Sequence, residues 1–154
     1  MNHDNIFTTL ATLGPIGHLQ APGTFGSLCA LVLVIIYNTF LMGTGYYWPA
    51  IAITIFLIAC IIDAALRALK RYDDPQEIVL DEVAGMIVAF AGIPLDFITV
   101  IVGFALFRLF DIFKPFGISY LQNISHSSSV ILDDLAAGLA TWYILHVLHA
   151  YQLL

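Results

Sequence analysis

The stretch IVLDEVAGMIVAF, residues 78–90, decides how this sequence folds, because it places two carboxylates at the head of an apolar run. Asp81 and Glu82 are adjacent, and the residues that follow them are aliphatic, aromatic or small. A charged group at membrane depth costs roughly 2.5–3.5 kcal/mol on insertion scales, and such groups generally serve a function. The stretch therefore predicts a helix of a membrane bundle whose acidic end binds something.

The overall composition indicates that lipid is the main solvent of this chain. Of its 154 residues, 60% are apolar and 10% are charged, and the mean hydropathy is +0.93. Soluble domains have about 45–50% apolar and about 25% charged residues. The net charge of −6 excludes a broad basic surface for nucleic acid.

Residues 1–27 contain no Lys or Arg, so we expect no cleaved secretory signal. Cys29 and Cys60 lie in apolar runs and are expected to be buried, without a disulfide framework.

Five apolar segments approach the length of about 17–25 residues that a membrane-spanning helix needs. They cover residues 27–47, 48–66, 78–94, 95–113 and 130–154. The turn-forming stretch GTGYYWP separates the first segment from the second, and GIPLD separates the third from the fourth. We therefore expect an all-α protein, a polytopic membrane bundle of about four to five apolar helices that forms a single domain over residues 1–154.

The positions of the basic residues predict how this bundle is oriented. All five lie in residues 67–71 and 108–114, and the positive-inside rule places both regions in the cytoplasm. With five spans, the stretch APGTFGS at 21–27, the segment before Asp81 and the connection between 114 and 134 lie on the same face. Most polar residues with chemical potential are thus predicted at the cytoplasmic face.

Three acidic groups meet at this face, at the start of the third segment, the end of the fourth and the start of the fifth. Their members are Asp81, Glu82, Asp111, Asp133 and Asp134. Carboxylates so close together repel one another unless a cation lies among them, and Mg²⁺ takes carboxylate oxygens together with substrate phosphate. Interfacial helix caps are the alternative, but they explain one pair better than three groups. We predict that all five acids bind a metal ion, Mg²⁺.

Two glycines are spaced so that they would bring these acids together. Gly85 follows Asp81 by four residues, and Gly138 follows Asp134 by four. Residues four apart share a helix face, and a small residue there lets two helices approach closely. The spacing predicts close helix contacts directly below the acids.

The stretch FRLFDIFKPFG, residues 107–117, supplies positive charge beside the acids. Arg108 and Asp111 are neighbours on one helical face, and Lys114 follows one turn later. Arginine binds phosphate oxygens through two parallel hydrogen bonds, and lysine acts as a point charge. We predict that Arg108 and Lys114 bind a substrate phosphate; basic side chains that extend to the interface are the alternative.

The stretch APGTFGS is a glycine-rich turn that leads into the first apolar segment. Exposed N–H groups at a helix N-terminus favour anions, and glycine permits a close approach. Thr24 and Ser27 add hydroxyl donors and are predicted to contact the same phosphate. An ordinary helix cap remains the alternative.

With APGTFGS, DPQEIVLDEVAG, FRLFDIFKP and DDLAAG in this order, the chain resembles the phosphatidylglycerophosphatase A family from about Thr12 to Ala140. The resemblance implies a multi-pass enzyme of the bacterial inner membrane that uses Mg²⁺. Its substrate would be phosphatidylglycerol phosphate, whose terminal phosphate monoester is hydrolysed to give phosphatidylglycerol. The family's acidic positions carry over onto the five acids above, and its basic ones onto Arg108 and Lys114. Phe116 and Gly117 replace prolines of the family, and SHSSSVIL replaces a glycine-rich stretch, so the loop geometry near the substrate stays open.

Two questions remain open at the level of sequence. Asp81, Asp111 and Asp134 are the candidate catalytic residues, and either one of them acts as a base toward water or an aspartate is itself phosphorylated. A small cation transporter or channel subunit is the alternative function, since membrane carboxylates also line ion paths. A pore should place acids along the span or at both faces, whereas here they concentrate at one face. The sequence does not predict the oligomeric state.

Overall fold

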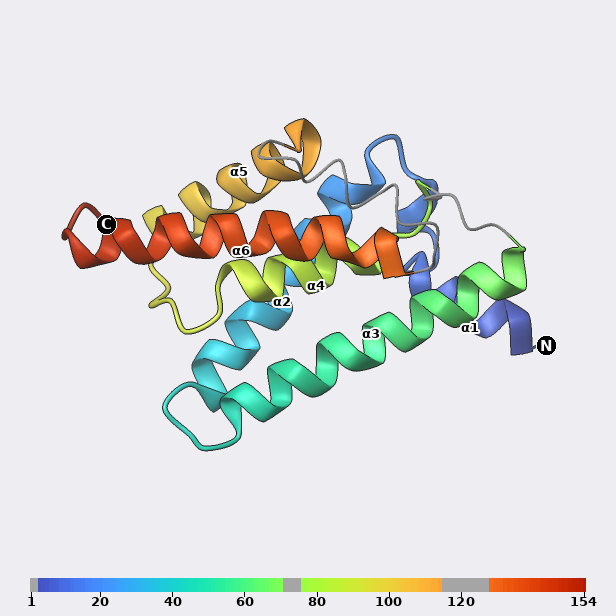
Figure 1. Ribbon diagram of the computed structural model, residues 1–154, viewed down its shortest axis with the longest axis horizontal. Helices are drawn as coiled ribbons and strands as arrows, with labels where there is room; N and C mark the ends of the chain where they lie inside the picture. Colours follow the sequence, from blue (N-terminus) through green and yellow to red (C-terminus); the bar gives the residue numbers. More distant parts are fainter. Residues whose placement is uncertain (1–2, 71–75, 115–127) are drawn as a thin grey trace.

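The structure, a computed structural model, describes residues 3–70, 76–114 and 128–154, and within these ranges all regular secondary structure is helical (Figure 1). The helices are α1 His3–Ala11, α2 Pro22–Ile36, α3 Tyr47–Leu69, α4 Leu80–Ala89, α5 Phe97–Phe113 and α6 Ser128–Ala150. A 3₁₀ turn, η1 (Ile16–His18), precedes α2, and a π turn, η2 (Tyr37–Leu41), extends it. The predicted all-α fold is confirmed.

Three helices of the described chain are long and apolar enough to cross a membrane: Pro22–Leu41, Tyr47–Leu69 and Ile131–Ala150. Between 22% and 39% of these helices is buried inside the protein, so most of their apolar side chains face outward. An outward apolar surface of this extent fits a bilayer. The free thiols of Cys29 and Cys60 lie on this outer surface. Our expectation that they are buried was wrong, because an apolar run in a membrane helix has a lipid-facing side.

The third predicted segment, residues 78–94, contains a short core helix. α4 has 10 residues, about 15 Å at 1.5 Å per residue, or half of a hydrocarbon core of about 30 Å. It ends before Gly92, whose φ of +71° permits a turn, and Pro94 follows. Eight of the ten α4 residues are buried. The fourth segment contains the 17 residues of α5, at the lower end of the length range of a span.

α4 packs against α2, α3 and α6, and α6 also packs against α5. Gly85 and Gly138 mark the crossing of α4 and α6, where a methyl group on Gly138 would overlap the carbonyl oxygen of Gly85. A methyl group on Gly85 would lie 2.6 Å from the carbonyl oxygen of Asp134. The predicted close contact below the acids is confirmed.

The N-terminal helix α1, which the sequence did not predict, packs against α3. The backbone N–H of Val79 donates to the carbonyl oxygen of Ala11 at 3.0 Å. Gly17 lies so close to the carbonyl oxygen of Glu77 that a Cβ atom would overlap it. The N-terminal segment therefore supports the chain that leads into α4 and its two acids.

Candidate active site

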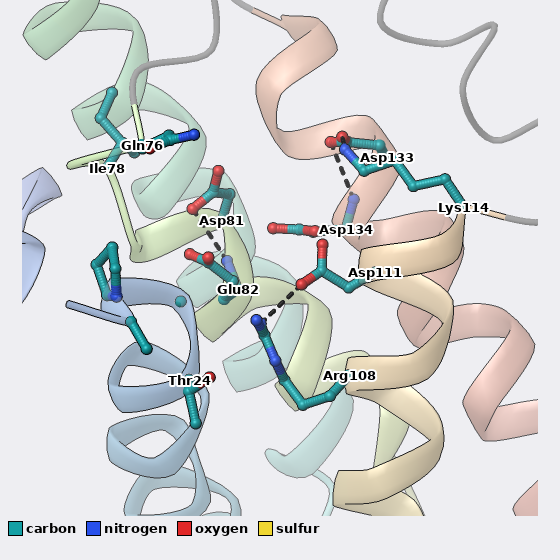
Figure 2. Close-up of a pocket in the computed structure, with 13 residues that line it drawn as sticks. Thr24, Gln76, Ile78, Asp81, Glu82, Arg108, Asp111, Lys114, Asp133 and Asp134 are labelled. Carbon is teal, nitrogen blue, oxygen red and sulfur yellow. Dashed lines mark hydrogen bonds and ion pairs between the residues drawn. The ribbon is translucent and has the colours of Figure 1, made fainter.

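A cavity of about 240 Å³ lies where the starts of α2, α4 and α6 meet the end of α5 (Figure 2). Every predicted site residue except Ser27 lines it. The lining residues are Ala21, Pro22, Gly23, Thr24, Gln76, Ile78, Asp81, Glu82, Arg108, Asp111, Lys114, Asp133 and Asp134. The structure thus brings together motifs that are separated by more than a hundred residues.

Three carboxylates converge at the floor of the cavity. One oxygen each of Asp81, Glu82 and Asp134 lies within 4.8 Å of the others. α4 supplies the first two from its first turn, and α6 supplies the third above the glycine crossing. Asp81 and Asp134 are 5% and 4% exposed. The spacing of four residues between each acid and its glycine therefore predicted the helix crossing that brings the carboxylates of α4 and α6 together.

The chemistry of this cluster fits a divalent cation. The Oε2 atom of Glu82 is buried and has no hydrogen-bond partner in the described chain. Burial raises the pKa of the Glu82 carboxyl, and the charge of Asp111 adds to this rise against the opposing effects of Asp81 and Arg108. Buried carboxylates are costly unless a partner compensates them. A hard ion with oxygen ligands would supply that compensation.

The other two predicted metal ligands each pair with a basic side chain. Arg108 Nη1 lies 2.7 Å from Asp111 Oδ2, and Lys114 forms an ion pair with Asp133. Lys114 ends α5 in the left-handed conformation, with φ of +42°. Asp111 also lies within hydrogen-bonding reach of Asp134, so it connects Arg108 to the three-carboxylate cluster (Figure 2).

Ser27 lies behind Arg108 and does not line the cavity. Its buried hydroxyl donates to the carbonyl oxygen of Gly23 at 2.7 Å and accepts a hydrogen bond from Arg108 Nη1 at 3.3 Å. The Nε atom of Arg108 is buried and has no hydrogen-bond partner in the described chain. Ser27 and Asp111 thus both hold the Nη1 side of the guanidinium. Thr24, by contrast, lies at the cavity, on the first turn of α2 (Figure 2).

Gly23 is a site residue that sequence reasoning did not single out. A Cβ atom at this position would overlap Glu82 Oε1 and would lie 3.1 Å from Arg108 Nη1. Only the missing side chain lets the start of α2 approach both the acidic cluster and the arginine. The two glycines of APGTFGS could have indicated this, but spacing alone does not say which of them meets the acids.

A carboxylate cluster suited to a divalent cation, with arginine and lysine beside it at one end of a membrane bundle, defines a membrane enzyme of the phosphoryl-transfer class. The comparison with known proteins agrees with this class. The chain belongs to the phosphatidylglycerophosphatase A family, whose model matches residues 9–149. It is therefore a lipid phosphatase.

The curated relatives cover most of the chain. Phosphatidylglycerophosphatase A of Haemophilus influenzae is 32% identical over 151 residues, which is 90% of this chain and 91% of the relative. The protein of the same name from Escherichia coli is 31% identical over 81% of this chain and 72% of the relative. A Bacteroides thetaiotaomicron protein provisionally named phosphatidylinositol-3-phosphatase is 32% identical over 82% of both. No solved structure matches the chain.

Proposed function

We propose that this protein hydrolyses the terminal phosphate monoester of phosphatidylglycerol phosphate, with Mg²⁺, at the cytoplasmic face of a bacterial inner membrane. The observation that supports this most is the convergence of Asp81, Glu82 and Asp134 in the cavity that Arg108 also lines, together with the buried Glu82 Oε2 atom, which has no hydrogen-bond partner among the described residues. Membership of the family supports the substrate. The transporter alternative has no support, because the carboxylate cluster lies at one end of the bundle and not along it.

Asp81, Glu82 and Asp134 are the residues we assign to the metal ion. Their ligand atoms are all oxygens, which suits Mg²⁺ better than softer ions. When bound, Mg²⁺ would neutralise charge on the phosphoryl group and lower the pKa of a bound water.

Arg108 and Lys114 are the residues we assign to the substrate phosphate, which carries about two negative charges near neutral pH. Asp111 and Ser27 hold the Nη1 atom of Arg108, which fixes the guanidinium in the cavity wall, where its charge attracts a phosphate. Thr24, at the start of α2, adds a hydroxyl donor on the opposite wall.

Asp111 is the residue we assign as the base, because it lies between the phosphate-binding arginine and the carboxylate cluster (Figure 2). It takes a proton from the attacking water as the water oxygen bonds to phosphorus. The bond from phosphorus to the lipid oxygen breaks, and that oxygen receives the proton from Asp111. Inorganic phosphate and phosphatidylglycerol are the products.

The test is phosphate release by the purified protein from phosphatidylglycerol phosphate, with Mg²⁺ and with a chelator. Phosphatidylinositol 3-phosphate serves as the comparison substrate, because one relative bears the name of that activity. We expect Mg²⁺-dependent release that is faster with phosphatidylglycerol phosphate and is abolished in Asp81→Asn protein. Equal release in the presence of the chelator would refute the metal assignment, and preference for the inositol lipid would refute the substrate.

A further inference from the structure

Four helices surround the acidic cavity in the order α2, α4, α6, α5, and three of the four neighbouring pairs are closely packed. Gly26 of α2 fits against Val79 at the start of α4, where a methyl group would lie 2.9 Å from the Val79 Cβ atom. The glycine crossing closes α4 against α6. Packing and the Lys114–Asp133 ion pair close α6 against α5.

The fourth pair, α2 and α5, is different. Within the described residues, α2 and α5 make almost no direct packing contact. The Arg108 Nη1 atom donates a hydrogen bond to the Ser27 hydroxyl, at 3.3 Å, and so connects the two helices. We call this boundary the α2–α5 seam; it is formed by residues 23–42 on one side and 95–108 on the other. The seam is the side on which helix packing does not close the cavity.

A second cavity, of about 570 Å³, lies further along the same seam. Ile35 and Met42 form one wall, and Leu95, Phe97 and Val100 form the other. α4 ends at Ala89, and none of its residues lines this cavity. Polar groups, from Asn38, Thr39 and Asp96, contribute the rest of its lining.

We propose that the α2–α5 seam is a lateral lipid-binding groove, through which the substrate phosphate reaches the acidic cavity from the bilayer while one acyl chain lies along the seam. The proposal rests on the proposed function, in which the substrate is a phospholipid. It adds the route of entry and the residues that contact the hydrocarbon, and its occupant is the acyl chain of that substrate.

The dimensions of the seam match this occupant. Arg108 and Phe97 are eleven residues apart on α5, which is about 16 Å along the helix axis. That distance is about half of a hydrocarbon core of about 30 Å, the depth of one leaflet. An acyl chain, which fills the depth of one leaflet, is therefore long enough to extend along the seam from Arg108 to the second cavity.

The charge pattern of the seam also matches hydrocarbon. Between the two cavities neither wall carries an acidic or basic side chain over residues 23–38 and 97–107, where Cys29 and Tyr37 are the ionisable groups. Leu28 and Ile35 on α2 and Ile101 on α5 are 45%, 50% and 52% exposed, although all three are large and apolar. Arg108 lies where this uncharged part of the seam meets the acidic cavity, and it would bind the phosphate there.

The test fills the groove and compares substrates that differ only in chain length. Ile35→Trp and Val100→Trp each add volume inside the second cavity, whereas Ile53→Trp adds it to an exposed apolar position of α3 that is 59% exposed. Added volume in a filled apolar site commonly costs at least about a fivefold change in an equilibrium constant. We expect the groove variants to raise KM by at least that factor for long-chain phosphatidylglycerol phosphate. For the dihexanoyl substrate their KM should stay unchanged, and Ile53→Trp should change neither.

The proposal fails if Ile35→Trp and Val100→Trp handle both substrates as Ile53→Trp does. Should the groove variants not accumulate, wild-type protein is photolysed with phosphatidylglycerol phosphate that carries a diazirine on its acyl chain. Adducts on residues 28–42 and 95–104 support the groove, and adducts confined to α3 or α6 overturn it. A wild-type protein that releases no phosphate from either substrate would contradict the proposed function instead, and the adduct map would still test the groove.

Discussion

At the scale of single residues, the site depends as much on two small side chains as on its charges. Ser27 and Gly23 carry no charge, yet one holds the guanidinium of Arg108 and the other leaves the space that Arg108 and Glu82 occupy. The acids and bases predicted from the residue types and their order line one cavity, and their roles stay predictions. The role of Ser27 was not predictable, because a buried hydroxyl that accepts from arginine and one that donates to phosphate look the same in sequence.

The first prediction concerns Gly23. In Gly23→Ala protein the new methyl group would overlap Glu82 Oε1 and press on Arg108, so both must move. We expect a loss of activity of at least tenfold, since displacing one charge-assisted contact costs about 1.5–3 kcal/mol. The measurement is kcat/KM with phosphatidylglycerol phosphate. Gly45→Ala is the matched control, because nothing lies within 4 Å of its Cβ position, and it should behave as wild type. Similar activity of both variants would contradict the close approach of α2.

At the scale of the elements, the sequence predicted the helices better than their lengths. After Glu82, the run to Pro94 contains only apolar and small residues and so has no periodicity that separates a spanning helix from a buried one. Its tertiary position decides, because α4 is surrounded by neighbours and ends at the turn around Gly92. Helix α1 was not predicted because it is short. It is stabilised by packing against α3, which the sequence does not show.

The second prediction concerns the start of α5, at the end of the bundle opposite the acids. Asp96 caps this helix by accepting from the backbone N–H groups of Thr99 and Ile98, and the Thr99 hydroxyl donates to it as well. The Thr99 backbone hydrogen bond, with that of its side chain, lowers the pKa of Asp96 below its ordinary value of 3.8. Because the pKa is lowered by folding, the cap stabilises the fold fully at a pH above the ordinary, unfolded-state pKa. This stabilisation is lost as the pH falls through the folded-state pKa.

We therefore expect the melting temperature of wild-type protein in detergent to fall between about pH 5 and pH 3, partly through this group. Asp96→Asn should melt at a lower temperature than wild type at the upper pH, and the difference should shrink toward the lower pH. Thermal unfolding of both proteins across this range is the measurement. A difference that stays constant with pH would mean that the ionised cap has no role.

At the scale of the whole molecule, the prediction that motifs far apart in sequence meet at one end of a helical bundle is confirmed by the cavity lining. The cytoplasmic orientation and the five-span topology stay predictions, because they rest on the distribution of Lys and Arg. The α2–α5 seam was not predictable from sequence, since it depends on which helices pack together.

The third prediction tests that orientation. Gln76 is exposed beside the cavity, and Thr44 is exposed in the turn between η2 and α3, where the other membrane face is expected. Single cysteines at these positions are introduced after Cys29 and Cys60 have been replaced by alanine. We expect an impermeant thiol reagent to label Thr44→Cys in intact cells, and Gln76→Cys after the cells are opened. The reverse pattern would place the acidic cavity outside the cytoplasm.

The most direct test of the metal-dependent site is to measure the binding of Mn²⁺, which accepts the same oxygen ligands as Mg²⁺ and is visible by electron paramagnetic resonance. In purified wild-type protein we predict bound Mn²⁺ that Mg²⁺ displaces. Binding should be weakened by at least tenfold in Asp81→Asn and in Glu82→Gln, since each loses a charged ligand worth about 1.5–3 kcal/mol. Arg108→Gln should retain it, because Arg108 is assigned to the phosphate. Binding that is unchanged in both carboxylate variants would contradict a cation site formed by Asp81, Glu82 and Asp134.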